Sequence, residues 1–304
     1  MDGTPEPSAP EPTPGAWSPP PPAPKPGVIP LRVLTFNEIL SGAFQTLRRH
    51  PGLLLGSAGV LLVVPQVVGL FLMLPLVDLY QQVLVEAERL RPGVVPDEFF
   101  SLVQRTIVAA LVVGLLSALG QVFLTGLVTV VVGRAVIGRP ITPGGAWAEL
   151  RPRMWRLIAV SILYGIAVVT GTLLCIVPGV WVSVLFSLAV PAVVLEKLPI
   201  RRSFKRSQAL VTNAWWSVFG MLVAVHILAG VVGYLVSLPF SVDFDYNPTK
   251  AFSVSTIVLG TLVAIVVGAV TAPFVSAVTA LVYLDRRIEV ERFDVQLAQA
   301  AQQP

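Results

Sequence analysis

Five long tracts without a charged residue dominate this sequence and limit what it can fold into: residues 51–77, 106–133, 157–195, 207–242 and 251–284. The hydrocarbon core of a bilayer is about 30 Å thick and takes roughly 20 apolar helical residues to cross. Inside lipid only helices and closed barrels satisfy every backbone hydrogen bond, and uninterrupted runs of this length favour helices. The sequence therefore predicts an all-α membrane protein with several spans. Charged residues make up 12% of the chain, about half the fraction in a soluble domain.

The tract 157–195 predicts two spans rather than one. A single helix over its 39 residues would be about 58 Å long, well beyond one crossing. Pro178-Gly179 lies near its middle, and this pair is a strong turn signal. We therefore predict six spans, near 52–77, 106–133, 157–177, 180–196, 214–238 and 252–284, forming a six-transmembrane-helix bundle within residues 31–284.

The distribution of basic residues predicts the orientation of these spans. With six spans and both termini in the cytoplasm, all but four of the 21 basic residues lie on the cytoplasmic side; the exceptions are Arg89, Arg91, Arg105 and Lys250. The positive-inside rule favours this orientation. Five spans would place the basic cluster 197–206 outside. The net charge of +4 follows this asymmetry, so we expect no nucleic-acid partner.

Two tails complete the domain organisation. Residues 1–30 contain twelve prolines and predict a disordered, Pro-rich cytoplasmic tail with polyproline II character. A docking site for a proline-binding module is the alternative. The acidic start without an apolar region that follows argues against a secretory signal. Residues 285–304 are predicted to be a second cytoplasmic tail.

A short amphipathic helix is expected before the first, third and fifth spans. Thr35 and Glu38 have the spacing of a capping box, and Thr142 is an N-cap candidate before Pro143. Apolar residues at helical spacing and basic residues predict helices that lie on the cytoplasmic membrane surface. The basic residues expected to face lipid are Arg48, Arg49, Arg151, Arg153, Arg201, Arg202, Lys205 and Arg206.

These helices suggest an internal repeat. When Ala43, Ala146 and Ser207 are aligned, Leu47, Leu150 and Val211 fall in register, and so do the small residues Gly56, Ala159 and Gly220 of the following spans. This alignment predicts three units, each an interfacial helix followed by a transmembrane hairpin. The alternative is that basic amphipathic segments simply recur between the spans of any membrane protein that obeys the positive-inside rule.

Several short motifs resemble one family. They are Leu34-Thr35-Phe36-Asn37-Glu38, Arg48-Arg49-His50-Pro51, Pro178-Gly179-Val180-Trp181, Glu196, Arg206-Ser207 and Asp285-Arg286-Arg287. Together they are similar to bacterial six-span proteins labelled "glycerophosphoryl diester phosphodiesterase membrane domain", over about residues 26–296. The resemblance implies a multi-pass protein of the bacterial plasma membrane, and it concerns the membrane region only, not the catalytic domain of multidomain relatives.

No catalytic or metal-binding constellation is evident in the sequence. A metal-dependent phosphodiesterase needs clustered His, Glu and Asp residues, whereas His50 and His226 are the only histidines and lie on different elements. Cys175 is the only cysteine and lies in an apolar tract, where a thiol is commonly an inert packing residue. Glycine-rich phosphate loops and nucleophile elbows are also absent. We expect no enzyme and no cofactor.

Two features inside the spans suggest roles in function or packing. His226 is the only ionisable side chain well inside a span; it could sense pH or gate a pathway, or it could be neutral and bonded to a neighbouring helix. In the sixth span, small residues recur every fourth position, at Gly260, Ala264, Gly268 and Ala272. Such ridges let helices approach closely, so we expect this span to be the central packing element.

The function suggested by these features is general. We expect a non-enzymatic membrane protein that organises lipids, anionic at the cytoplasmic face, or a partner membrane protein. Basic interfacial helices motivate this hypothesis, because anionic lipid attracts each nearby Lys or Arg by about 1 kcal/mol. A transporter or translocator of a lipid-like or small apolar substrate is the alternative.

Overall fold

A computed structural model describes residues 28–30, 32–89, 96–241 and 254–291. Within these residues the protein is all-α and has no strand. Six helical segments are long and apolar enough to cross a membrane. The chain is therefore an all-α, multi-pass membrane protein with six candidate spans, as the sequence predicts.

The helices follow one another as three units, each a short helix before two candidate spans; in the second unit the second span is divided between α6 and α7. Two 3₁₀ turns, η1 (Arg151–Arg153) and η2 (Thr212–Ala214), join the short helix to the next in the second and third units. The α-helices are α1 (Phe36–Arg49), α2 (Pro51–Arg89), α3 (Asp97–Val136), α4 (Pro143–Leu150), α5 (Met154–Leu174), α6 (Ile176–Phe186), α7 (Ala189–Leu195), α8 (Ile200–Val211), α9 (Trp215–Ser241) and α11 (Val254–Glu291).

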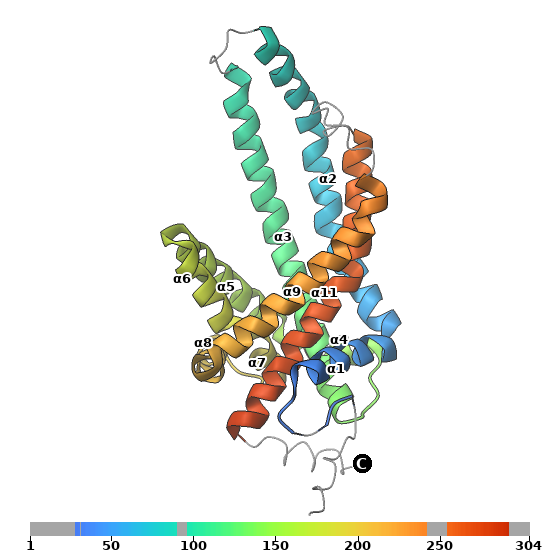
Figure 1. Cartoon of the computed structure of the whole chain (residues 1–304), viewed down its shortest axis with the longest axis vertical. Helices are drawn as coiled ribbons and strands as arrows, with labels where there is room; N and C mark the ends of the chain where they lie inside the picture. The colour runs from blue at the N-terminus through green and yellow to red at the C-terminus, as the bar shows by residue number, and fades with distance from the viewer. Residues whose placement is uncertain (1–27, 31, 90–95, 242–253, 292–304) are drawn as a thin grey trace, which may run out of the picture.

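The two ends of the bundle differ. In Figure 1 the short helices α1, α4 and α8 lie at the lower end, which we call the basal end. The upper or distal end holds the far ends of α2, α3, α9 and α11. The buried hydrophobic core is concentrated toward the basal end, where α11 contributes Ala277, Leu281 and Tyr283, all at most 1% exposed. The α5–α6 hairpin diverges from the other long helices and ends near mid-height in the view of Figure 1.

The helices of the first two spans, α2 and α3, are longer than the predicted spans of 52–77 and 106–133. Helix α2 continues to Arg89 and α3 already begins at Asp97, so each is about 60 Å long. The added turns carry Asp78, Arg105 and other charged residues, which a hydrocarbon core disfavours. The length of the apolar tract predicts the part of the helix that crosses the membrane. It does not predict the helix ends, because a helix can continue into water with its backbone hydrogen bonds intact.

The predicted turn at Pro178-Gly179 is displaced. The chain leaves helix at Cys175, whose backbone is extended (φ −172°, ψ 153°), and Pro178 lies in the first turn of α6, where a missing N–H costs nothing. Gly179 serves close packing instead, because a Cβ there would lie 2.8 Å from the backbone nitrogen of Thr172. A second break at Ser187–Leu188 separates α6 from α7, so the predicted fourth span, 180–196, is a discontinuous helix.

Both predicted tail boundaries also change. Val28 and Ile29 are buried, at 2% and 0% exposed, so packing begins before residue 31. At the other end, Asp285 and Ile288 are buried within α11, so the predicted tail 285–304 begins as helix. The remaining tail residues, 1–27 and 292–304, lie outside the described residues, and the prediction of disorder there stays a prediction.

The repeat alignment is reflected in burial. Ala43, Ala146 and Ser207 are each 0% exposed. Eleven residues further on, Leu54, Leu157 and Val218 are also buried, at no more than 1% exposed. The small residues of the same alignment do not pack in this way: Gly56 and Gly220 have no atom within 4 Å of an added Cβ. Equivalent positions thus face the core in each unit, but the aligned glycines face outward.

The small-residue ridge of the sixth span packs over only part of its length. Gly260 and Ala264 are exposed, which contradicts their predicted packing role within this chain. At Gly268 an added Cβ would lie 3.0 Å from Leu62 Cδ1, and Ala272 packs against the buried core. The ridge wraps around the helix because a step of four residues exceeds one 3.6-residue turn, so its distal members leave the contact with α2.

Candidate functional site

An ionic network ties α7, α8 and α11 together at the basal end. Glu196 accepts hydrogen bonds from the hydroxyl of Tyr283 and from Arg206 at 2.9 Å, and lies 3.2 Å from Arg287 Nε. Glu291 pairs with the same two arginines. Four of these residues are charged and mutually compensated, which is how low-dielectric surroundings tolerate them. Arg206 is therefore a structural cation, and its predicted role at the lipid surface is wrong.

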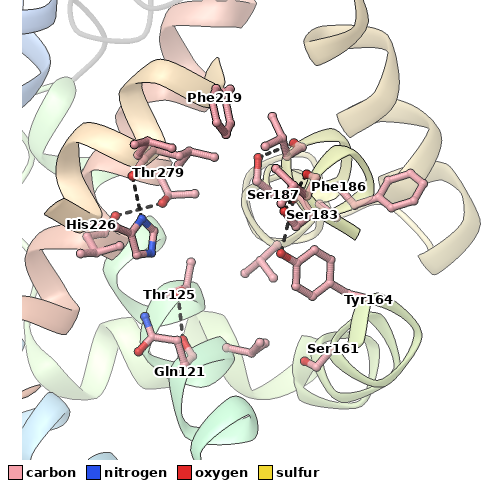
Figure 2. Close-up of a pocket in the computed structure, with 18 of the residues that line it drawn as sticks. Gln121, Thr125, Ser161, Tyr164, Ser183, Phe186, Ser187, Phe219, His226 and Thr279 are labelled. Carbon is pink, nitrogen blue, oxygen red and sulfur yellow. Dashed lines mark hydrogen bonds between the residues drawn. The ribbon is translucent and has the colours of Figure 1, made fainter. Parts of the chain in front are cut away.

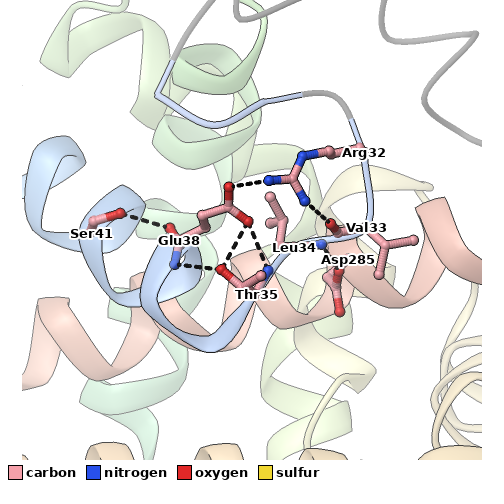
Figure 3. Close-up of polar contacts among 7 residues, drawn as sticks. All are labelled: Arg32, Val33, Leu34, Thr35, Glu38, Ser41 and Asp285. Atoms are coloured by element: carbon pink, nitrogen blue, oxygen red, sulfur yellow. Dashed lines mark hydrogen bonds and ion pairs between the residues drawn. The ribbon is translucent and has the colours of Figure 1, made fainter. Parts of the chain in front are cut away.

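The segment before α1 is fixed to α11 as well. The backbone N–H of Leu34 donates to Asp285 Oδ1 at 2.7 Å, and both groups are buried (Figure 3). The predicted capping box is confirmed: the Thr35 hydroxyl accepts from the Glu38 N–H, and the Glu38 carboxylate accepts from the Thr35 N–H at 2.8 Å. Arg32 adds an ion pair to Glu38 at 2.7 Å. The motifs around Thr35, Glu196, Arg206 and Asp285 thus lie at the basal end, where they stabilise the fold, whereas Pro178-Gly179 lies near the tip of the α5–α6 hairpin.

Six of the predicted lipid-facing basic residues remain exposed at the basal end: Arg48, Arg49, Arg151, Arg201, Arg202 and Lys205. None of the six forms an ion pair with another described residue. Arg153 differs, because it is only 9% exposed and donates to the backbone carbonyl of Glu149 at 2.8 Å. Its predicted contact with lipid is therefore wrong, and the positive surface consists of the other six.

Exposed tryptophans lie at the same end, a feature that the charge pattern alone did not reveal. Trp147 on α4, Trp155 at the start of α5 and Trp216 at the start of α9 are 48%, 74% and 75% exposed. Trp155 and Trp216 occupy equivalent positions in the repeat alignment, which is the signal that could have predicted them. Tryptophan prefers the membrane–water interface, so the basal end combines the two residue types typical of that layer.

A cavity of about 690 Å³ lies above the basal core, between the α5–α6–α7 segment and helices α3, α9 and α11. Its wall is mostly apolar. Polar side chains reach it from all of these neighbours (Figure 2): Gln121, Thr125, Ser161, Tyr164, Ser183, Ser187, His226 and Thr279. This volume falls within the range of about 300–1,000 Å³ typical of small-molecule sites.

The break between α6 and α7 forms part of this cavity's wall. Ser207, on α8 and fully buried, donates to the Leu185 carbonyl at 2.7 Å and accepts from the Leu188 N–H at 3.2 Å. One hydroxyl thus satisfies backbone groups that the break leaves without helical partners. Discontinuous helices beside a cavity are a common construction for sites within a membrane.

His226 lines the cavity from α9. Its Nδ1 lies 2.7 Å from the carbonyl oxygen of Leu222, one turn earlier on the same helix. This contact requires the proton on Nδ1, so in the neutral ring Nε2 is an acceptor. The partner of Nδ1 thus belongs to the histidine's own helix, whereas one of the two alternatives drawn from the sequence places a partner on a neighbouring helix. Within the described residues, no three side chains among His, Cys, Asp and Glu gather as a metal site would require.

The fold and these surfaces define a polytopic, all-helical membrane protein with a basic, aromatic end and a cavity within the bundle. Residues 36–286 match a family model described as "Domain of unknown function (DUF7847)". The match covers most of the chain, from the start of α1 to the basal part of α11, so the chain belongs to this family. No curated protein and no solved structure matches it. The resemblance to the phosphodiesterase-labelled membrane domain stays a prediction.

Proposed function

We propose that this protein binds and organises lipids at the cytoplasmic face of the membrane, with a preference for anionic headgroups, and that it does so without catalysing a reaction. The observation that carries the proposal is a set of exposed cations at the basal end that form no ion pair with another described residue: Arg48, Arg49, Arg151, Arg201, Arg202 and Lys205. Each contributes about 1 kcal/mol of attraction near an anionic surface, and the three exposed tryptophans anchor the same layer.

The basal end is then the cytoplasmic end of a plasma-membrane protein, and both termini are cytoplasmic. Single cysteines at Ser8, Ser101 and Gln299 test this orientation in a Cys175→Ser background with an impermeant thiol reagent. We expect labelling of intact cells only at Ser101, which lies on α3 near the distal end. Labelling at Ser8, or protection of Ser101, would contradict the orientation.

Lipid selectivity is tested with the purified protein. We expect phosphatidylglycerol to bind more tightly than phosphatidylcholine of the same chain length, measured by native mass spectrometry across a salt series. Replacing Arg201, Arg202 and Lys205 by glutamine removes about 3 kcal/mol of attraction, roughly a hundredfold in affinity. Arg89 and Arg105, exposed near the distal end, are the matched control when replaced in the same way. Equal retention of the two lipids would overturn the proposal.

Translocation of a lipid-like or small apolar substrate is the second candidate, favoured by the cavity and by the broken helix beside it. Substrate flux in proteoliposomes that is lost in His226→Leu would support translocation. Metal-dependent turnover of glycerophosphodiesters by the purified protein would instead contradict the non-enzymatic proposal. A partner membrane protein that co-purifies would add a second role to lipid organisation rather than replace it.

A further inference from the structure

The hydroxyl groups that line the cavity share one property: their hydrogen atoms are directed to the protein's own backbone. Ser161 and Thr125 donate to carbonyl oxygens of their own helices at 2.6 and 2.8 Å, and so do Ser183, Ser187 and Thr279. Tyr164 donates across the hairpin to the Ser183 carbonyl at 3.3 Å. Each hydroxyl oxygen retains acceptor capacity after it has donated.

Of the two remaining polar side chains, His226 follows this arrangement and Gln121 does not. His226 uses Nδ1–H for the Leu222 carbonyl, which leaves Nε2 as an acceptor in the neutral ring. Gln121 donates one amide hydrogen to Ser276 Oγ at 3.2 Å and keeps one N–H and a carbonyl oxygen. The cavity therefore offers many acceptors and few donors, so a matching ligand must bring hydrogen-bond donors of its own.

The lack of charged side chains in the cavity wall further limits the class of ligand that the cavity can bind. The residues that line the cavity include no Asp, Glu, Lys or Arg, so neither a carboxylate nor an ammonium head would find a counter-ion there. A buried ion without a partner is costly. The cavity wall includes Val180, Val223 and Ile227, which are 37%, 37% and 61% exposed, so an apolar chain can leave it toward lipid between α6 and α9.

We propose that this cavity binds an uncharged lipid whose head carries hydroxyl groups, such as a monoacylglycerol. The hydroxyls donate to the Ser, Thr, Tyr and His acceptors, and the acyl chain passes over Ile227 into the surrounding lipid. This site is separate from the basic surface at the basal end, and its occupancy does not depend on anionic lipid.

The experiment compares three probes with the same oleyl or oleoyl chain: 1-oleoylglycerol, oleate and oleylamine. Each is titrated against the purified full chain, and binding is measured by native mass spectrometry. We expect saturable binding of one 1-oleoylglycerol, at least about tenfold tighter than that of oleate or oleylamine. Oleate or oleylamine binding as tightly as 1-oleoylglycerol would overturn the proposal.

Variants locate the site. Ile227→Trp fills the chain's exit, and we expect it to weaken 1-oleoylglycerol binding by about tenfold or more. His226→Phe keeps a ring but removes an acceptor, and we expect a smaller loss, about fivefold for one hydrogen bond. Val266→Trp, at a position on α11 that is 59% exposed and does not line the cavity, is the control. If all three variants bind 1-oleoylglycerol as the parent protein does, the lipid binds elsewhere and the proposal is wrong.

Discussion

The two halves of α11 differ sharply in their surroundings, although both are apolar. From Val254 to Ala272 no residue of the helix is buried, whereas from Pro273 to Ile288 nearly every residue is. Lipid tails are as apolar as leucine, so hydrophobicity alone gives a transmembrane helix no reason to pack against protein rather than lipid. The buried half instead contains Ser276, Tyr283 and Asp285, which make polar contacts with other segments. Specific contacts hold the basal half, and we infer that lipid covers the distal half.

The largest expected effect concerns the basal network. Glu196→Ala removes the acceptor shared by Tyr283, Arg206 and Arg287, and breaking such a compensated set costs about 3–5 kcal/mol. We expect a large fall in the thermal unfolding midpoint in mild detergent. Arg105→Ala, an exposed position near the distal end, is the control and should change stability by no more than about 0.5 kcal/mol. Similar midpoints for the two variants would refute the role given to the network.

A smaller effect is expected where the small-residue ridge meets α2. Gly268→Leu introduces a side chain whose Cβ would lie 3.0 Å from the flexible end of Leu62, and overpacking of this kind costs about 1–3 kcal/mol. The matched variant Gly260→Leu lies two ridge steps away with no atom within 4 Å of its Cβ, so its thermal midpoint should equal that of the parent. A fall in the midpoint of Gly260→Leu would show that another molecule packs against the distal ridge.

The smallest expected effect is an absence of reaction. Cys175 is exposed at the tip of the α5–α6 hairpin, among Leu173, Leu174 and Ile176, which are 72–82% exposed. Because the tip carries no charged residue, we expect it to lie within lipid. An impermeant thiol reagent should then leave Cys175 unmodified in sealed and in opened membranes, while detergent should expose it. Rapid modification in intact cells would place the tip in water outside the membrane.

The sequence was informative about the membrane and less so about contacts between helices. Apolar length and charge asymmetry predicted the six spans, and the spacing of Thr35 and Glu38 predicted the first cap, because these depend on local chemistry. The network around Glu196 joins residues almost a hundred positions apart, which no local pattern encodes. The sequence context of Arg153 and Arg206 matches that of the six exposed cations and so predicts lipid contact for them as well. Only the three-dimensional arrangement shows that both are already engaged.

The cavity illustrates the same limit. An ionisable residue inside a span suggests a functional role for His226, and this side chain lies in the cavity wall. The neighbouring serines and threonines could not be distinguished from residues that hold helices together. Their assembly depends on the break between α6 and α7, which Ser207 stabilises from α8. A break without a proline at the break point has no strong sequence signal.

Lipid contact of the distal half of α11 can be measured directly in a bilayer. Spin labels at Leu259, Leu262, Val266 and Val270, each at least 40% exposed, test it directly in a Cys175→Ser protein reconstituted in bilayers. If lipid covers this half, all four positions should give mobile spectra with high accessibility to oxygen and low accessibility to a polar nickel reagent. Immobilised spectra with low oxygen accessibility at these positions would show instead that protein, not lipid, covers this surface.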